Sequence, residues 1–127
     1  FEVEDVQVVW VDTEEKQNLE RVSGKVLERF RECTAVFCYN DEVAFGLLDI
    51  FKKNGVRVPQ DISVASVDDS ELAILGEVAI TSTPHPMERL GAKAAENLIR
   101  MIKDPAFDAN YEFEVDVVPR NSVRRLK

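Results

Sequence analysis

Residues 34–73, TAVFCYNDEVAFGLLDIFKKNGVRVPQDISVASVDDSELA, carry the clearest fold signal of the chain. The runs 34–39 and 62–67 are apolar almost throughout, and continuous apolarity is typical of a strand buried on both faces of a parallel sheet. Between them, apolar residues recur at helical spacing over 43–51, and Asn54-Gly55 predicts the end of that helix. The stretch therefore predicts a strand, a helix and a second strand.

The same alternation continues on both sides of this stretch. Further strands are expected over 6–11, 78–81 and 111–117, and helices over about 16–31, 70–75 and 87–103. We expect Trp10 to lie in the core, and the strict alternation of 111–117 predicts a half-buried edge strand. A buried stripe is expected on the last helix at Met87, Leu90, Ala94, Ala95, Leu98 and Ile102. The fold class is therefore α/β, with a mainly parallel sheet flanked by helices.

The charge of the chain argues against direct nucleic-acid binding. The 127 residues carry 24 acidic and 16 basic side chains, a formal net charge of -8. Four of the basic residues lie in 120–127, so residues 1–119 hold 12 basic against 24 acidic groups. Such a surface repels phosphate backbones, and no basic recognition helix is visible.

The cysteine content and hydropathy indicate an intracellular protein. Cys33 and Cys38 are too few for a disulfide framework and form no CxxC pair, so we expect buried free thiols. There is no signal sequence and no apolar run long enough to span a membrane. We expect a soluble protein in the cytoplasm. Because the chain begins at Phe1 without an initiator Met, we interpret it as a piece of a longer protein.

Polar groups gather where the predicted strands end. In an open α/β sheet, ligands bind beyond the carboxyl ends of the strands, which places Asn40, Asp68 and His85 at the candidate site. Carboxylate and amide groups there suit a neutral sugar, whose hydroxyls donate and accept hydrogen bonds. Asp41 and Asp69 occupy natural N-cap positions, so we expect them to close helix ends. For Asn40 and Asp68, ligand contact and a structural role remain equally open.

Other features of this rim exclude several chemistries. It has no glycine-rich phosphate loop, and a single His without a Cys pair offers no zinc spacing, so no metal or cofactor is expected. No nucleophile and base lie at a catalytic spacing, and we predict no catalytic residue. A single His such as His85, between Pro84 and Pro86, is more often a surface or hinge residue than a catalyst. Phe45 points away from the apolar face of its helix, which predicts either a dimer contact or a singly exposed aromatic.

Three segments resemble the lac-repressor/galactose-repressor (LacI/GalR) family of transcription regulators. Residues 34–73 match its pattern of strand, Asn-Asp, helix, Gly-x-x-Val-Pro-x-Asp-Ile-Ser-Val and Asp-Asp. Residues 80–99, ITSTPHPMERLGAKAAENLI, and 118–125, VPRNSVRR, are similar to its later connector and its closing Arg-x-Ser. The order is that of the family, and finer details of 13–16, of the connector and of the tail are similar to its arabinose-repressor branch.

The resemblance implies the C-terminal lobe of a type-I periplasmic-binding-protein-like fold, in which a sugar binds between two lobes. Residues 1–84 and 111–120 would form the lobe, and 85–104 would cross to the N-terminal lobe. The DNA-binding domain is absent from this chain. The family pattern implies effector contacts by Asn40, by Asp68 and by the loop around Glu14. Its usual Gln is His85 here, which can still form a hydrogen bond.

The expected function is therefore sugar sensing and dimerisation in a bacterial regulator of carbohydrate metabolism. Phe45 matches a helix position of the family's dimer interface, which implies a homodimer. Operator DNA would be bound only through the missing domain, and L-arabinose is the first sugar to try. The alternatives are a periplasmic-type sugar-binding protein of a transporter and a carboxylate-based sugar hydrolase using Asp41, Asp68 and Asp69.

Overall fold

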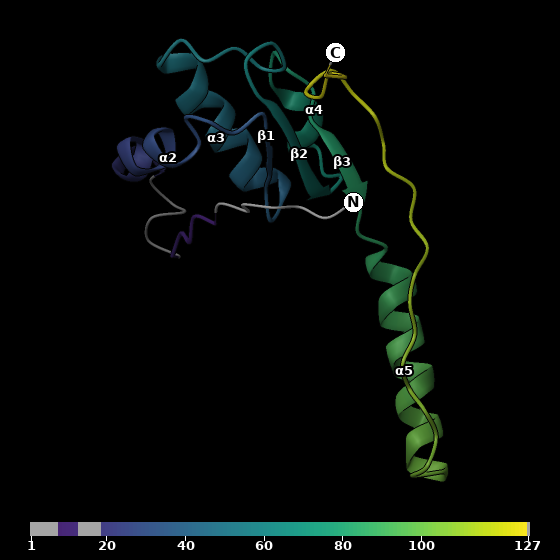
Figure 1. The fold of residues 1–127 in the computed structure, drawn as a ribbon. Coiled ribbons are helices and arrows are strands. Elements are labelled where there is room, and N and C mark those ends of the chain that lie inside the picture. Colours follow the sequence, from purple (N-terminus) through teal and green to yellow (C-terminus); the bar gives the residue numbers. More distant parts are fainter. Residues whose placement is uncertain (1–7, 13–18, 127) are drawn as a thin grey trace.

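A computed structural model describes residues 8–12 and 19–126 of the chain (Figure 1). Its elements follow the expected alternation of helices and strands. In chain order they are η1 (Leu19–Val22), α2 (Ser23–Arg29), β1 (Ala35–Phe37), α3 (Asp41–Lys53), β2 (Ser63–Asp68), α4 (Leu72–Leu75), β3 (Thr81–Pro84) and α5 (Met87–Lys103).

The three strands form one parallel sheet in the order β1-β2-β3. Val36 of β1 pairs with Val64 of β2, and Asp68 at the end of β2 pairs with Pro84 at the end of β3. The prediction of a parallel α/β sheet is confirmed. Because all three strands run the same way, their carboxyl ends meet at one edge of the sheet.

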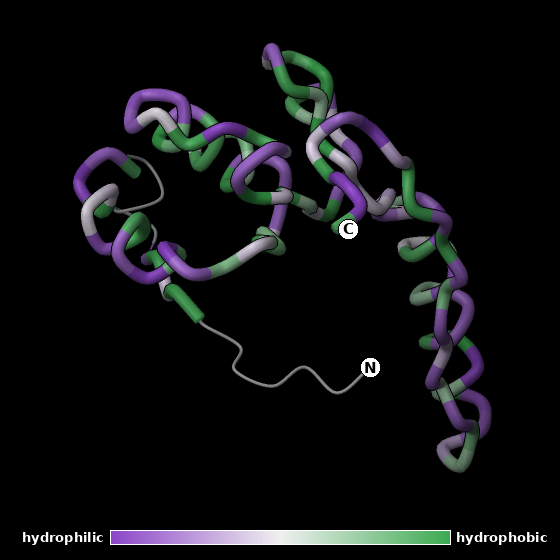
Figure 2. Tube along the Cα trace, turned by 45° about the horizontal axis from the view of Figure 1, so that its top comes forward, coloured by the Kyte–Doolittle hydropathy of each residue, from purple (hydrophilic) through white to green (hydrophobic). Residues whose placement is uncertain are grey.

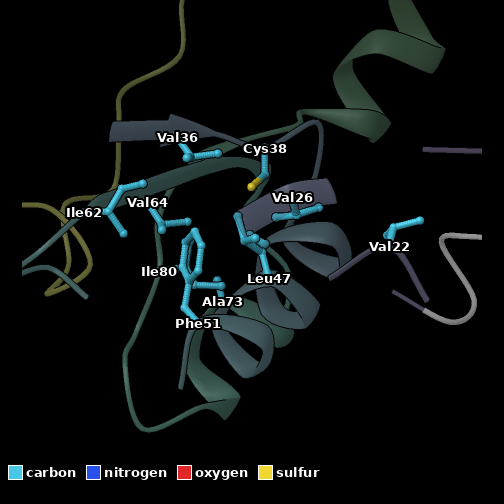
Figure 3. Close-up of a cluster of buried hydrophobic side chains, with 11 residues drawn as sticks. Val22, Val26, Val36, Cys38, Leu47, Phe51, Ile62, Val64, Ala73 and Ile80 are labelled. Carbon is cyan, nitrogen blue, oxygen red and sulfur yellow. The ribbon is translucent and has the colours of Figure 1, made fainter. Parts of the chain in front are cut away.

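The core lies between the sheet and the helices α2, α3 and α4 (Figure 3). These helices bury their apolar residues in one cluster against the sheet, so they cover the same face of it. The cluster comprises Val22, Val26, Val36, Cys38, Ala44, Leu47, Phe51, Ile62, Val64, Ala73 and Ile80. Helix α3 ends where Gly55 takes the left-handed conformation, with φ 75°, which glycine adopts without steric cost.

The other face of β1 differs from the expectation of burial on both faces. Val36 is buried, but Phe37 on the opposite face is 68% exposed. No helix or strand among residues 8–12 and 19–126 covers that face. A cavity of about 1230 Å³ extends along β1 and is lined from both of its faces, by Phe37 and Tyr39 on one side and by Val36, Cys38 and Leu47 on the other.

The expected strand 6–11 is wrong for the part that the structure describes. Residues 8–11 form no strand, and 6–7 lie outside the described residues. Trp10 is 82% exposed instead of lying in the core. The carbonyl oxygen of Trp10 accepts a hydrogen bond from the Lys25 ammonium group instead of from a neighbouring strand. The described part of the expected helix 16–31 is η1 followed by α2, which ends at Arg29, and residues 16–18 lie outside the described residues.

The last helix and the segment after it project from the sheet. Helix α5 leaves the carboxyl edge of β3, and the chain returns alongside it towards the sheet (Figure 1). The expected stripe on α5 is not buried, since Met87, Leu98 and Ile102 are all largely exposed. In Figure 2, hydrophobic residues recur along this projecting arm.

The expected strand 111–117 is wrong, because this return segment contacts a helix instead of a strand. The Phe113 ring lies 5.3 Å from the Arg89 guanidinium, and the Tyr111 ring lies 4.9 Å from the Lys93 ammonium nitrogen. Tyr111 and Phe113 thus face α5, whereas Val115 and Val117 of the same alternation are exposed. The segment reaches the sheet only at Val118, which forms an antiparallel bridge with Ser82 of β3.

The expected strand 78–81 lies three residues later, at β3. Ile80 instead enters the core, and its backbone amide donates to the carbonyl oxygen of Ala73 in α4. That contact draws the chain away from the sheet until Thr81, where pairing with Ala65 begins.

Candidate functional site

The candidate site lies at the carboxyl edge of the sheet. Asn40 follows β1, Asp68 ends β2, and His85 follows β3. The parallel pairing of the strands therefore brings groups from three separate parts of the sequence to the same edge. This is the edge at which open α/β sheets bind their ligands.

Asp68 and His85 lie side by side across the ends of β2 and β3. The His85 Nδ1 atom is 3.6 Å from the Asp68 carboxylate, and the His85 amide donates to the Asp68 carbonyl oxygen at 3.4 Å. The two side chains are 46% and 39% exposed, so both reach solvent. A carboxylate acceptor beside an imidazole can bind the hydroxyl groups of a polar ligand.

The backbone at Asp68 and Asp69 is bent in an uncommon way. Their φ angles are 108° and 52°, the only positive values among non-glycine residues in the described part of the chain. Residues other than glycine adopt such φ angles at a cost in free energy, which surrounding contacts must offset. The bend turns the chain sharply at the end of β2, where Asp68 presents its carboxylate.

Asn40 caps helix α3, which corrects the prediction that Asp41 does so. The Asn40 Oδ1 atom accepts a hydrogen bond of 3.0 Å from the Val43 amide. The Asn40 Nδ2 group has no partner among residues 8–12 and 19–126, so it remains a possible donor to a ligand. The capping role of Asn40 thus uses its Oδ1 atom, whereas a contact with a ligand would use its Nδ2 group.

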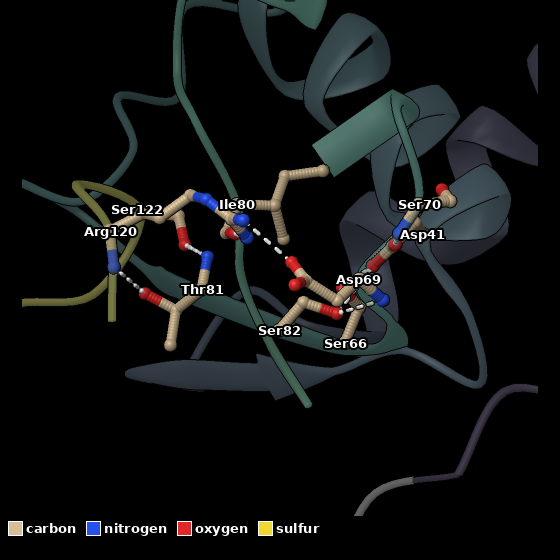
Figure 4. Close-up of polar contacts among 9 residues, drawn as sticks. All are labelled: Asp41, Ser66, Asp69, Ser70, Ile80, Thr81, Ser82, Arg120 and Ser122. Atoms are coloured by element: carbon tan, nitrogen blue, oxygen red, sulfur yellow. Dashed lines mark hydrogen bonds and ion pairs between the residues drawn. The ribbon is translucent and has the colours of Figure 1, made fainter. Parts of the chain in front are cut away.

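Asp41 lies in the interior instead, only 1% exposed (Figure 4). Its carboxylate accepts hydrogen bonds from the hydroxyls of Ser66 and Ser82 and, at 2.6 Å, from the Ser70 amide. Burial opposes ionisation, but these hydrogen bonds outweigh it and hold the pKa of Asp41 below its ordinary value of 3.8. Asp41 therefore ties α3 to β2, β3 and the start of α4.

Asp69 is not an N-cap either, because α4 begins at Leu72 and has no side-chain cap. One oxygen of its carboxylate lies 2.6 Å from the Arg120 Nη2 atom (Figure 4). This contact is an ion pair and not an aligned hydrogen bond, since that oxygen meets no hydrogen-bond donor in suitable geometry within the described residues. Both side chains are mostly buried, at 22% and 18% exposure.

The remaining predicted residues lie elsewhere. Phe45 is partly buried against the core and lines a cavity of about 360 Å³ with Leu48, Lys52 and Gly76. Its helix face is therefore less open than expected, although Phe45 and Lys52 do line the same cavity. Glu14 lies outside the described residues.

The structure also reveals contacts that sequence reasoning missed. Ser66, Ser82, Arg120 and Ser122 all support the carboxyl edge or the strands that lead to it. Small serines inside apolar strands give little signal of such a role. The signal that was available is the closing Arg-x-Ser of the tail, since these are Arg120 and Ser122.

The three carboxylates proposed for a hydrolase do not face one another as a catalytic set. Asp41 is held by serines and Asp69 by Arg120. Within 8–12 and 19–126, no three His, Cys, Asp or Glu side chains are grouped to hold a metal ion. In the same ranges, no helix has the length and apolarity needed to cross a membrane.

Comparison with known proteins identifies related sequences over nearly the whole chain. The periplasmic binding protein-like domain family matches residues 2–123. The chain is 37% identical over 106 residues to the transcriptional repressor PurR of Vibrio parahaemolyticus, covering 83% of this chain and 32% of PurR. It is 38% identical over 109 residues to the arabinose metabolism transcriptional repressor of Geobacillus stearothermophilus, covering 83% of this chain and 30% of that repressor.

A solved structure of a related regulator has the same fold. A LacI family transcriptional regulator from Enterococcus faecalis with bound ribose matches with a TM-score of 0.73 and 28% identity, covering 98% of this chain and 46% of that one. The chain spans about a third of the length of the two repressors that it matches.

Proposed function

Because the chain belongs to the periplasmic binding protein-like domain family, we propose that it forms the C-terminal portion of the sugar-sensing domain of a transcriptional repressor. The predicted resemblance to LacI-type regulators is confirmed by the repressors and the regulator to which it is similar. The observation that carries the proposal is the pairing of Asp68 with His85 at the carboxyl edge of a parallel sheet.

The chemistry of this edge suits a neutral sugar. The Asp68 carboxylate accepts from hydroxyl groups, the imidazole of His85 can donate or accept, and the Asn40 Nδ2 group donates. L-arabinose is the first candidate, since one relative is an arabinose metabolism repressor. D-ribose is the second, since a neighbouring structure holds ribose.

We divide the chain between two lobes as follows. Residues 1–84 and 111–120 belong to the C-terminal lobe, with Glu14 as a further sugar contact, and 85–104 cross to an N-terminal lobe. The exposed apolar side chains of α5 support this division, because such a stripe is typical of a surface that another body covers. The relatives, about three times longer, have room for that second lobe.

The proposed mechanism is a shift of population without covalent chemistry, so the domain is not an enzyme. Sugar closes the cleft, the lobes of a homodimer that contains Phe45 in its interface reorient, and attached DNA-binding domains change their affinity for operator DNA. We assign the protein to the cytoplasm, where transcription regulators act. The named relatives are repressors, which favours this function over a transport protein or a hydrolase.

A calorimetric titration of the full-length protein tests the proposal. The wild type is titrated with L-arabinose and D-ribose, beside Asn40→Asp, which can keep the helix cap, and Asp68→Ala. Each variant should weaken binding of the preferred sugar by about 1–3 kcal/mol. Asp116→Ala, an exposed carboxylate in the return segment, is the matched control and should bind as the wild type does. Absence of binding to either sugar, or binding that neither variant weakens, would overturn the proposal.

A further inference from the structure

We propose that Arg120 is a positioning residue for sugar binding: its guanidinium holds Asp69 and thereby fixes the bend that presents the Asp68 carboxylate. The inference rests on the proposed sugar site and adds a residue that does not itself contact the sugar. Arg120 lies in the tail, far from Asp68 in sequence, and is only 18% exposed.

The bend needs support because two consecutive residues adopt left-handed backbone angles. Asp68 has φ 108° and Asp69 has φ 52°. Asp adopts this backbone region at a lower cost than most residues do. Without contacts that stabilise the bend, however, other backbone conformations of Asp are favoured. The direction of the Asp68 side chain follows from these angles, so contacts that fix the bend also fix the candidate sugar-binding carboxylate.

Besides the hydrogen bond from the His85 amide to the Asp68 carbonyl oxygen, three contacts hold the bend, each from a different part of the fold (Figure 4). The Asp69 amide donates to the Ser82 hydroxyl of β3 at 3.1 Å. The Ser70 amide donates to the Asp41 carboxylate of α3 at 2.6 Å. The Asp69 carboxylate forms the ion pair with Arg120 at 2.6 Å. Of these, only the Arg120 contact acts on a side chain of the bend.

Arg120 is itself held rigidly. Its Nη1 group donates to the Ile80 carbonyl oxygen at 2.8 Å, and its backbone amide donates to the Thr81 hydroxyl at 2.9 Å. The guanidinium therefore bridges the residue before β3 and the bend after β2, with a planar group that loses little freedom on binding. Within the described residues the Asp69 Oδ1 atom has no other polar partner, so removing Arg120 leaves a mostly buried carboxylate oxygen uncompensated.

The network stops short of the candidate sugar-binding group. The structure pairs the Asp68 carboxylate with His85 and with no member of the network. Arg120 is thus expected to change how Asp68 binds without contacting the sugar. This separates a positioning role from direct binding, because the effect of Arg120 should vanish once Asp68 is removed.

A double-mutant cycle in the full-length protein tests this, with L-arabinose and D-ribose as probes. Arg120→Gln and Asp69→Asn should each weaken binding about tenfold in the wild-type background and have little further effect in Asp68→Ala. Arg120→Lys, which keeps the charge, should recover part of the loss. Arg125→Gln removes a charge from an exposed residue of the same tail and is the matched control. Asp69→Asn keeps a residue that tolerates the bend, so it serves if Arg120→Gln does not fold.

Amide hydrogen exchange without sugar gives an independent result. In Arg120→Gln and Asp69→Asn, the amides of Asp69 and Ser70 should exchange about tenfold faster, while those in α3 keep their wild-type rates. Unchanged exchange at the bend, or an equal loss of affinity in the Asp68→Ala background, would overturn the positioning role. If the wild type binds neither sugar, the proposed function fails, and the exchange rates still decide whether Arg120 holds the bend.

Discussion

The side-chain oxygen of Asn40 accepts a hydrogen bond of 3.0 Å from the backbone amide of Val43, which closes the first turn of helix α3. Asn40→Ala should therefore lower the free energy of unfolding by about 1 kcal/mol even without a ligand. Asn40→Asp should retain most of that stability, because a carboxylate oxygen can accept the same hydrogen bond. Urea denaturation of both variants measures the difference, and equal losses would contradict the capping role.

Acid should weaken the fold through Asp41. Hydrogen bonds hold the pKa of this carboxyl below its ordinary value of 3.8 in the folded chain, so its ionised form stabilises the fold above that pH. The contribution is lost as the pH falls through the folded pKa, when the carboxylate is protonated. Unfolding free energies from about pH 7 to about pH 3 should fall less steeply for Asp41→Asn than for the wild type.

Glu112→Gln is the matched control for this acid prediction, since Glu112 is exposed. It should keep the wild-type pH dependence. An Asp41→Asn protein whose stability falls as steeply as that of the wild type would show that other groups govern the loss of stability at low pH.

The buried hydroxyl of Ser122 should be costly to remove. It donates to the Val64 carbonyl oxygen at 2.6 Å and accepts from the Thr81 amide at 2.7 Å, joining β2 to β3. Ser122→Ala leaves both groups buried without this partner, and we expect a loss of about 1–3 kcal/mol in the free energy of unfolding. Asn121→Ala, at the exposed neighbouring position, should cost far less in the same denaturation experiment.

The two cysteines should differ sharply in reactivity. Burial raises the pKa of the Cys38 thiol from 9.0 to about 12, which reduces its thiolate population near neutral pH about a thousandfold. Iodoacetamide should therefore modify Cys33, which is partly exposed, long before Cys38. Mass spectrometry of the peptides reports the two rates, and both should become similar in urea. Rapid native labelling of Cys38 would show that the core opens readily.

The proposed dimer can be tested through Phe45. If its ring lies in a subunit interface, Phe45→Ala should weaken self-association of the full-length protein at least tenfold. Sedimentation velocity over a range of concentrations measures this. Val123→Ala shortens another exposed apolar side chain and should leave the association unchanged. An unchanged dimer in Phe45→Ala would place the interface on another surface.

The sequence predicted the parallel sheet because its signal is local. The apolar runs that became β1 and β2 and the helical spacing between them need no knowledge of the rest of the fold. The ends of the predicted strands also placed Asn40, Asp68 and His85 at one edge of the sheet, and the structure brings the last two together.

The predictions fail where the structure depends on contacts with residues remote in sequence. Asn40 takes the capping role expected of Asp41, because the hydroxyls of Ser66 and Ser82, remote in sequence, bind the Asp41 carboxylate in the interior. Likewise, the alternation of 111–117 cannot say whether a strand or helix α5 lies beside it. Phe37 and Trp10 are apolar enough for a core, but no described element of this chain covers them.

The hydrogen bonds between Val64 and Ser122 also set an order of events during protein synthesis. The two residues are 58 positions apart, so at cellular rates the ribosome adds Ser122 about 3 to 12 s after Val64. During that interval the nascent β2 has its amide and carbonyl at Val64 without their final partner in the tail. Until Ser122 has been added, β2 therefore lacks these hydrogen bonds. Chaperones can bind the strand in this state, and a pause in translation prolongs its exposure.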